Sequence, residues 1–340
     1  MIISESMGRD AAITVADLGE FGLISQIRAV LPPDPAGVIG AGDDGAVLPA
    51  PDGRVVASTD LLVEGRHFRH DWSAAADVGV KAAAQNLADV AAMGAEPTAL
   101  LFGLAIPGDL AAAWVLDVAR GMAAECQRAG AFIAGGDVTS SDVIMLAITA
   151  LGNLHGRDPV TRSGARPGDV VAISGPVGRS AAGLALLLAD AAAGPSQMPD
   201  MQAPETRALV AAHRRPQPDY SAGPVAAVAG ATSMIDISDG LVADLGHIAE
   251  ASGVRIDIAA RLLPGSRALM AAAAELGADW REWAVQGGED HALAATFPAR
   301  SKVPEGWTVI GDVSSGTGIL VDSQQWRGAG GWDHFPGPRS

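Results

Sequence analysis

The chain has 340 residues and a mass of 34.3 kDa, a length typical of two domains or of one large one. Hydrophobic residues make up 49% and charged residues 18%, so the composition supports a buried core and excludes intrinsic disorder as the overall state. The formal net charge of −16 argues against binding of nucleic acid or of an anionic membrane surface by bulk electrostatics. An anionic ligand would therefore need cations to bind.

Cysteine content and apolar runs restrict the class further. Cys126 is the only cysteine, which excludes an internal disulfide and a cysteine-based metal centre within one chain, and which fits a reducing compartment. The first ten residues contain no basic stretch followed by an apolar one, so no signal peptide is expected. The apolar runs are also too short to span a bilayer. We therefore expect a cytoplasmic protein without a membrane partner.

Helical and extended segments alternate along the chain. In the first half we expect helices at 17–31, capped by Asp17, at 73–93 and at 110–129, and strands at 54–63, 99–106, 131–134 and 143–151. In the second half we expect strands at 169–174 and 234–237 and helices from Arg179 and over 241–251. Residues 153–168 combine Gly, Pro, Arg and Asp without an apolar period. This stretch predicts a boundary between a domain at 1–153 and a domain at 154–340.

A glycine-rich turn at 40–45 matches the G-x-G-x-x-G pattern of dinucleotide-binding proteins. That function needs a helix directly after the turn, whereas Pro49 and Pro51 follow an extended segment here. The adjacent carboxylates of Asp43 and Asp44 would also repel a phosphate. A tight acidic turn and a metal-binding turn both remain open. A P-loop is excluded, because neither of the two lysines precedes Ser or Thr.

Carboxylates recur where predicted strands end or helices begin, in 58–60, in 135–137, and at Asp236 and Asp239. Asp89 instead lies within a helix, on one stripe with Lys81 and Gln85 and in apolar surroundings where an ionised carboxylate needs a partner. Each of these residues alone is explained by a cap or a turn. If they converge, however, they need divalent cations, and oxygen ligands select Mg²⁺, Mn²⁺ or Ca²⁺. Magnesium held by carboxylates commonly serves substrate phosphates.

Eight motifs, in this order along the chain, together resemble the thiamine-monophosphate kinase family. They are GDDGAV (42–47), STDLLVEGRHF (58–68), KAAAQNLADVAAMGA (81–95), GGD (135–137), TRSGARPGD (161–169), IDISDGL (235–241), GGED (287–290) and GWDHF (331–335). The motifs cover nearly the whole chain. The family belongs to the superfamily of aminoimidazole ribonucleotide synthetase, selenophosphate synthetase and the hydrogenase maturation carbamoyl dehydratase.

The resemblance implies an α+β fold of two α/β domains. The N-terminal domain would bind ATP and Mg²⁺, and its mixed or antiparallel sheet would pair with that of a second copy in a homodimer. The C-terminal domain would be an α/β sandwich that completes the nucleotide and substrate site. The implied reaction is transfer of the γ-phosphoryl group of ATP to thiamine phosphate, giving thiamine diphosphate. The transfer would be direct and in line, assisted by several Mg²⁺ ions, with no covalent intermediate.

The resemblance also assigns roles to residues. Metal ligands fall on Asp43, Asp44, Ser58, Thr59, Asp60, Asp89, Asp137, Asp236 and Asp239. The catalytic role falls on Asp60, Asp89, Asp137, Asp236 and Asp239. ATP contacts fall on Gly136, Asp137, Arg162 and Ser238, and thiamine contacts on His67, Glu289 and Trp332, with Trp326 as the alternative aromatic residue.

Two other functions stay open at this point. One is that of another superfamily enzyme, such as a selenophosphate synthetase or an aminoimidazole ribonucleotide synthetase. A selenophosphate synthetase generally carries a reactive Cys near its N-terminus, and no cysteine precedes Cys126. The hydrogenase maturation protein ends in a reactive Cys, whereas this chain ends in Ser340. The second is a non-catalytic magnesium–nucleotide-binding protein, against which the retained carboxylates argue.

Overall fold

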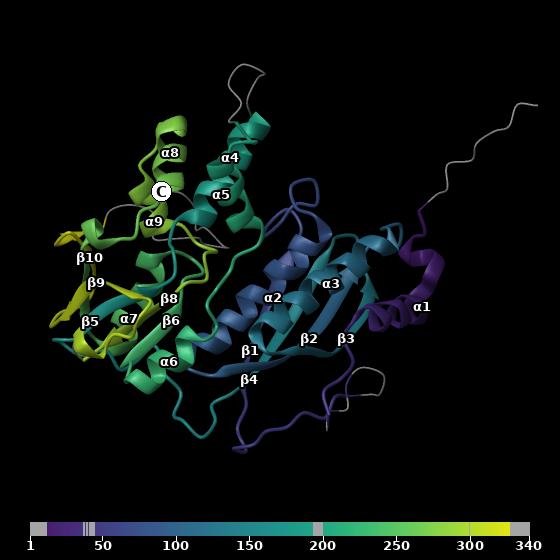
Figure 1. Cartoon of the computed structure of the whole chain (residues 1–340), viewed down its shortest axis with the longest axis horizontal. Coiled ribbons are helices and arrows are strands. Elements are labelled where there is room, and N and C mark those ends of the chain that lie inside the picture. Colours follow the sequence, from purple (N-terminus) through teal and green to yellow (C-terminus); the bar gives the residue numbers. More distant parts are fainter. Residues whose placement is uncertain are drawn as a thin grey trace, which may run out of the picture.

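The computed structural model describes residues 12–36, 38, 40, 45–192, 200–298 and 300–326 (Figure 1). Asp43, Asp44 and Trp332, which the sequence assigns to the metal and to thiamine, therefore lie outside the described residues. Two lobes lie side by side, each built on its own sheet (Figure 1). None of the described helices has the length and apolar character needed to cross a bilayer. The cytoplasmic location stays a prediction.

The first lobe is a mixed sheet covered on one face by helices. Its elements are α1 (Val15–Val30), β1 (Val56–Val63), α2 (Ala75–Ala92), β2 (Glu96–Ile106), α3 (Ala112–Ala129), β3 (Phe132–Ser140) and β4 (Met145–Asn153). The strand order is β1-β4-β2-β3, with β2 and β3 parallel and the other pairs antiparallel. The expected mixed sheet is confirmed.

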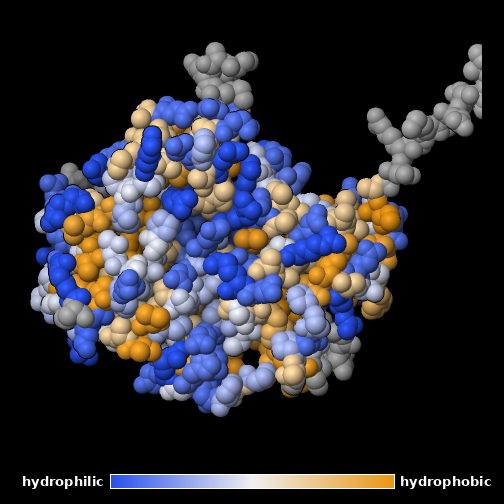
Figure 2. Space-filling view, viewed as in Figure 1, coloured by the Kyte–Doolittle hydropathy of each residue, from blue (hydrophilic) through white to orange (hydrophobic). Residues whose placement is uncertain are grey.

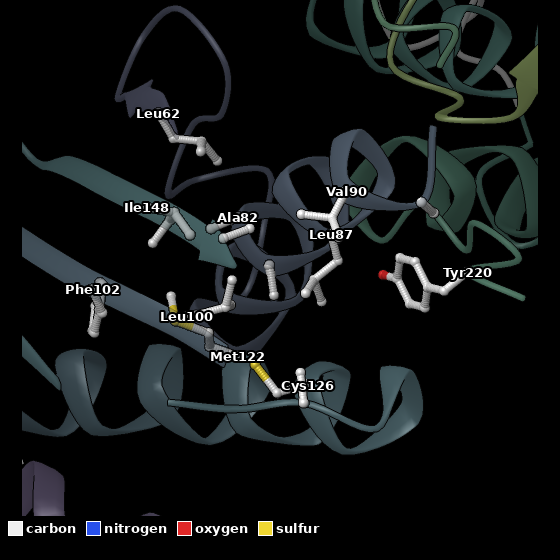
Figure 3. Packing of buried hydrophobic residues seen from close by; sticks show 14 of the residues in the cluster. Leu62, Ala82, Leu87, Val90, Leu100, Phe102, Met122, Cys126, Ile148 and Tyr220 are labelled. Carbon is white, nitrogen blue, oxygen red and sulfur yellow. The ribbon is translucent and has the colours of Figure 1, made fainter. Parts of the chain in front are cut away.

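Helices α2 and α3 pack closely because each contributes a glycine to their crossing. A Cβ atom on Gly79 would lie 2.0 Å from the Val118 carbonyl oxygen, and one on Gly121 would lie 2.0 Å from that of Ala76. The two backbones therefore touch, which presses Leu87 of α2 into the core formed with the sheet (Figure 3). The tight crossing fixes the polar side of α2, which bears Gln85 and Asp89, against the end of the sheet.

The second lobe is a seven-stranded mixed sheet with helices packed around it. Its helices are α4 (Arg179–Ala192), α5 (Pro204–Arg214), α6 (Ala222–Ala229), α7 (Leu241–Ser252), α8 (Arg267–Leu276) and α9 (Trp280–Gln286). Its strands are β5 (Val170–Ser174), β6 (Ser233–Asp236), β7 (Arg255–Ile258), β8 (Leu293–Phe297), β9 (Trp307–Ser314), β10 (Gly318–Val321) and β11 (Gln324–Gln325). The strand order is β11-β10-β7-β9-β5-β8-β6. The described part of the chain is thus α+β with two sheets, as expected.

One hydrophobic cluster spans both lobes, while two further clusters lie mainly within the second lobe. Buried Tyr220, just before α6, belongs to the same cluster as Leu87 and Cys126 of the first lobe (Figure 3). The Tyr220 hydroxyl donates to Glu125 of α3 at 2.5 Å, and the Arg128 guanidinium donates to the carbonyl of Pro218 at 2.9 Å. The two sheets lie on either side of the stretch that we predicted as a boundary, and one of the hydrophobic clusters crosses it. The domain boundary therefore stays a prediction.

Two local expectations differ from the structure. Thr14, not Asp17, caps α1: the Thr14 hydroxyl accepts the Asp17 N–H at 3.2 Å, while the Asp17 carboxylate accepts the Thr14 N–H at 2.9 Å. Strand β3 also extends to Ser140, so Gly136 and Asp137 lie within it and not after it. Gly136 is needed there because a Cβ atom would lie 2.0 Å from the Phe102 carbonyl oxygen.

Hydrophobic and hydrophilic side chains are interspersed over the visible surface, with an apolar group at the end of the molecule formed by α1 (Figure 2). Phe21 of α1 is 82% exposed there.

Candidate active site

Carboxylates from both lobes meet where the end of α2 faces β1 and β6. Asp60 lies on β1, Asp89 on α2, and Asp236 ends β6. The Ser58 hydroxyl donates to the Asp89 carboxylate at 2.6 Å, and the Gln85 amide donates to that of Asp60 at 3.2 Å. Both donors are neutral groups, so these bonds hold the two acids in place without supplying a positive charge.

The pKa of Asp89 reflects the influence of the other two carboxylates. Burial, followed by repulsion from Asp236 and then Asp60, raises the pKa of Asp89 to about 8. The Ser58 hydroxyl opposes this shift without overcoming it. An acid with such a pKa sits where a positive charge is missing.

The turn between β6 and α7 contains Ser238 and Asp239. It is stabilised by Asp244, a residue that the sequence analysis did not single out. The buried Asp244 carboxylate accepts the N–H groups of Asp239 and Gly240 at 3.1 and 3.0 Å. Burial and then the charge of Asp236 raise the pKa of Asp244 to about 7. Its only sequence signal was an Asp in the first turn of a helix, which is too common to single out.

A second charged cluster, next to the first, is balanced. Glu289 forms an ion pair with the Lys81 ammonium of α2 at 3.0 Å and faces His213 of α5 at 3.4 Å. Burial raises the pKa of Glu289, but the charges of Lys81 and then of His213 lower it by more, so the net shift is downward. Burial and then the charge of Lys81 lower the pKa of His213 to about 4. Lys81 therefore serves as the cation of this cluster.

Lys81 also joins the two residues expected to contact thiamine. Its ammonium donates to the His67 carbonyl at 2.9 Å while it pairs with Glu289. The expected convergence of His67 and Glu289 across the lobes is thus present, through a lysine that is only 2% exposed. The His67 ring accepts the Val63 N–H at 3.0 Å through Nδ1, which fixes its orientation.

Two of the expected metal ligands point to the other face of the first sheet. Asp137 pairs with Gly103, Gly103 with Ala147, and Ala147 with Leu61, and directly paired residues share one face. Leu61 is 52% exposed on the face opposite α2, and Thr59 alternates onto the same face. Asp137 is also three strands away from β1, or about 14 Å at the usual strand spacing. Within one chain, Thr59 and Asp137 are therefore not brought to the acidic cluster.

The remaining expected contacts are spread around the site. Ser238 accepts the Glu289 N–H through its carbonyl at 2.8 Å, which ties the two motifs together. Arg162 is exposed, and its carbonyl accepts the Ser252 hydroxyl at 3.2 Å at the far end of α7 from Asp239. That helix has 12 residues, so about 18 Å separates its ends. Trp326 packs partly buried against the core of the second lobe.

The donor set fits a hard divalent cation only with help from a ligand. Within residues 12–36, 45–192, 200–298 and 300–326, no three His, Cys, Asp or Glu side chains come close enough to hold one ion. Mg²⁺ typically uses one or two carboxylates, with waters and substrate phosphates filling its other positions. The acidic cluster offers oxygen donors, which hard cations prefer, and a bound cation would stabilise the ionised form of Asp89, whose pKa is about 8.

Comparison with known proteins identifies the family. Residues 42–154 match the model of AIR synthase related protein, N-terminal domain. Thiamine-monophosphate kinase from Mycobacterium tuberculosis (strain H37Rv) is 47% identical over 327 residues, covering 96% of this chain and 94% of the relative. The chain belongs to the thiamine-monophosphate kinase family. The resemblance recognised in the sequence is confirmed.

Solved structures of the family agree with the fold. The crystal structure of thiamine monophosphate kinase from Aquifex aeolicus superposes with a TM-score of 0.74 at 34% identity, covering 92% of this chain and 99% of that one. AaThiL complexed with AMPPCP and TMP superposes with a TM-score of 0.76 at 33% identity, covering 98% and 100%. This chain therefore shares the fold of these solved relatives over nearly its whole length.

Proposed function

We propose that the protein transfers the γ-phosphoryl group of ATP to thiamine phosphate, giving thiamine diphosphate. The observation that carries the proposal is the pairing of an uncompensated acidic cluster with a neighbouring site built from His67, Lys81 and Glu289. The first suits cations that accompany phosphates, and the second contains His67 and Glu289, which we assign to thiamine. The relative complexed with AMPPCP and TMP supports this reading, since it holds an ATP analogue and TMP together.

The phosphate group of thiamine phosphate can accept the phosphoryl group without a general base. A phosphate monoester has a second pKa near 6, so its attacking oxygen is largely anionic at neutral pH. The difficulty is to bring two polyanions together, and positioning with electrostatics supplies most of the catalysis in such transfers. A direct in-line transfer without a covalent intermediate follows from this chemistry.

The acidic cluster would meet that difficulty by holding magnesium. Bound Mg²⁺ would neutralise phosphate charge and align the donor and acceptor oxygens. Asp60, Asp89 and Asp236 are the ligands that the geometry favours, with Asp239 beside them on the turn before α7. Ser58 and Gln85 fix the orientation of two of these carboxylates through hydrogen bonds. The assignments of Asp43, Asp44, Gly136 and Arg162 stay predictions.

A homodimer would give Thr59 and Asp137 a role. Both lie on the open face of the first sheet, which also exposes Leu61 and Leu101 at 52% and 36%. Apolar side chains on an uncovered sheet face favour pairing with a second sheet. In such a dimer these two polar residues would face the partner copy. Light scattering at micromolar concentration should therefore give twice the chain mass, and a monomer mass would contradict the dimer.

The function is tested directly by incubating the protein with ATP, Mg²⁺ and thiamine phosphate and measuring thiamine diphosphate and ADP. We expect both products in equal amounts, and no reaction after EDTA treatment until Mg²⁺ is restored. Formation of selenophosphate or aminoimidazole ribonucleotide from the matching substrates would favour another superfamily enzyme. Tight ATP binding without any turnover would favour a non-catalytic nucleotide-binding protein.

A further inference from the structure

Three consecutive residues before β8 reach three different parts of the site. Glu289 pairs with Lys81, Asp290 accepts the Ser180 N–H at 2.8 Å at the start of α4, and His291 contacts Asp236. Glu289 and His291 have φ values of 61° and 53°, a region that non-glycine residues rarely adopt. Such strain persists where the surroundings demand it and is frequent at functional sites.

The His291 contact fixes one oxygen of a proposed metal ligand. The distance between His291 Nδ1 and Asp236 Oδ2 is 3.2 Å, and the two residues are only 4% and 5% exposed. A carboxylate can only accept, so Nδ1 carries the proton in this bond. This contact restrains the Asp236 carboxylate, whose charge also raises the pKa of Asp89.

The other ring nitrogen gives a second, independent observation. His291 Nε2 is buried and has no hydrogen-bond partner among the described residues. A buried polar atom without a hydrogen-bond partner destabilises the folded state, which an apolar residue of similar size would not do. A histidine retained here for packing alone would be unfavourable. Its charge is influenced by carboxylates of both clusters, namely Asp236 and Asp89 of the acidic cluster and Glu289 of the second one.

We propose that His291 is a positioning residue, which orients the Asp236 carboxylate for the divalent cation. The inference rests on the proposed function and deepens it by adding a residue that does not itself contact the reacting atoms. It parallels the general rule that groups bonded to a metal ligand fix its orientation and influence metal affinity. Loss of the Nδ1–H donor should then weaken cation binding even if the protein stays folded.

The test uses the full chain and Mn²⁺, whose binding is followed by electron paramagnetic resonance, alone and with a non-hydrolysable ATP analogue. His291→Asn keeps a donor near the position of Nδ1, and Asn tolerates the left-handed backbone. His291→Leu fills similar space without a donor. Tyr220→Phe is the matched control, because it removes a buried hydrogen bond to Glu125 away from the cluster. Thermal unfolding of each variant reports stability separately.

We expect His291→Leu to raise the Mn²⁺ dissociation constant about tenfold or more, while His291→Asn stays within about threefold of wild type. Tyr220→Phe should lower the melting temperature without changing Mn²⁺ binding. Wild-type Mn²⁺ affinity in His291→Leu, or equal weakening in both His291 variants, would overturn the positioning role. Either result could occur while the wild-type protein still makes thiamine diphosphate. Absence of that turnover in the wild type would instead contradict the proposed function.

Discussion

The two charged clusters at the junction of the lobes differ in how their charge is balanced. In the acidic cluster of Asp60, Asp89 and Asp236, the contact of His291 with Asp236 does not prevent the rise in the pKa of Asp89 to about 8. Glu289, a neighbour of this cluster, has its own cation in Lys81, and its pKa is lowered. The ammonium group of Lys81 thus balances the charge of Glu289, whereas the acidic cluster is not fully balanced by side chains of the protein. We therefore expect the acidic cluster, and not the cluster around Glu289, to bind a cation.

The largest effect should come from weakening the uncompensated cluster. Asp60→Asn should lower turnover by about 100-fold or more, as removal of one transition-state electrostatic contact does. Steady-state kinetics at saturating ATP and thiamine phosphate measure it. Asp117→Asn, on the exposed side of α3 and paired with Arg120, is the control that should keep wild-type turnover. Equal turnover in Asp60→Asn and the control would remove Asp60 from catalysis.

Unbalancing the second cluster should act on stability. Lys81→Met leaves Glu289 without its ammonium partner and should cost about 2–3 kcal/mol in the free energy of unfolding. This is less than for a fully buried pair, because the Glu289 side chain is 31% exposed to water. Adding Glu289→Gln to Lys81→Met should recover most of the loss, which urea unfolding would show. Strictly additive losses in the double variant would mean that the two residues are not coupled.

Glu289→Gln by itself tests which substrate this cluster serves. We expect the KM for thiamine phosphate to rise about tenfold and the KM for ATP to change by less than about twofold, the pattern of a lost ground-state contact to one substrate. The two substrates are varied separately in the kinetics. An equal rise for both, or a rise for ATP alone, would place Glu289 away from thiamine.

The smallest effect should be a gain in stability that depends on pH. The pKa of Asp89 rises from 3.8 to about 8 in the folded protein, so folding favours its protonated form. The resulting penalty is absent below pH 4 and grows until pH 8. Without divalent cations, Asp89→Asn should therefore raise the melting temperature by about 2–4 °C at pH 8 and by nothing at pH 4.

Added Mg²⁺ provides the control for that gain. The cation should stabilise the wild type more than Asp89→Asn and so reduce or reverse the difference, since a ligand stabilises the state that binds it. Calorimetry across pH with EDTA or Mg²⁺ separates the two cases. A pH-independent difference would mean that Asp89 is already ionised without penalty.

The sequence alone determined the kinds and order of the elements and several members of the site. Strand and helix periods placed most elements of the first lobe close to their observed bounds, because local patterning carries that information. Asp89 stood out because a carboxylate in an apolar helix needs a partner, and its stripe with Lys81 and Gln85 could be seen from spacing. Asp60 and Asp236 stood out as carboxylates where predicted strands end, and the family motifs added the role of Glu289.

The interaction partners of the charged side chains became clear from the tertiary structure alone. Residues of the same stripe on α2 have different partners. Gln85 donates to Asp60, whereas Lys81 pairs with Glu289, 208 positions further along the chain. Ser58 and Thr59 were both expected to bind metal, but neighbouring residues of a strand point to opposite faces, and the packing of α2 decides which face meets the acidic cluster. His291 carried no sequence signal because its role depends on a partner brought near by the pairing of β6 with β8. Charges act through distance, and the distances between residues remote in sequence are set by the fold.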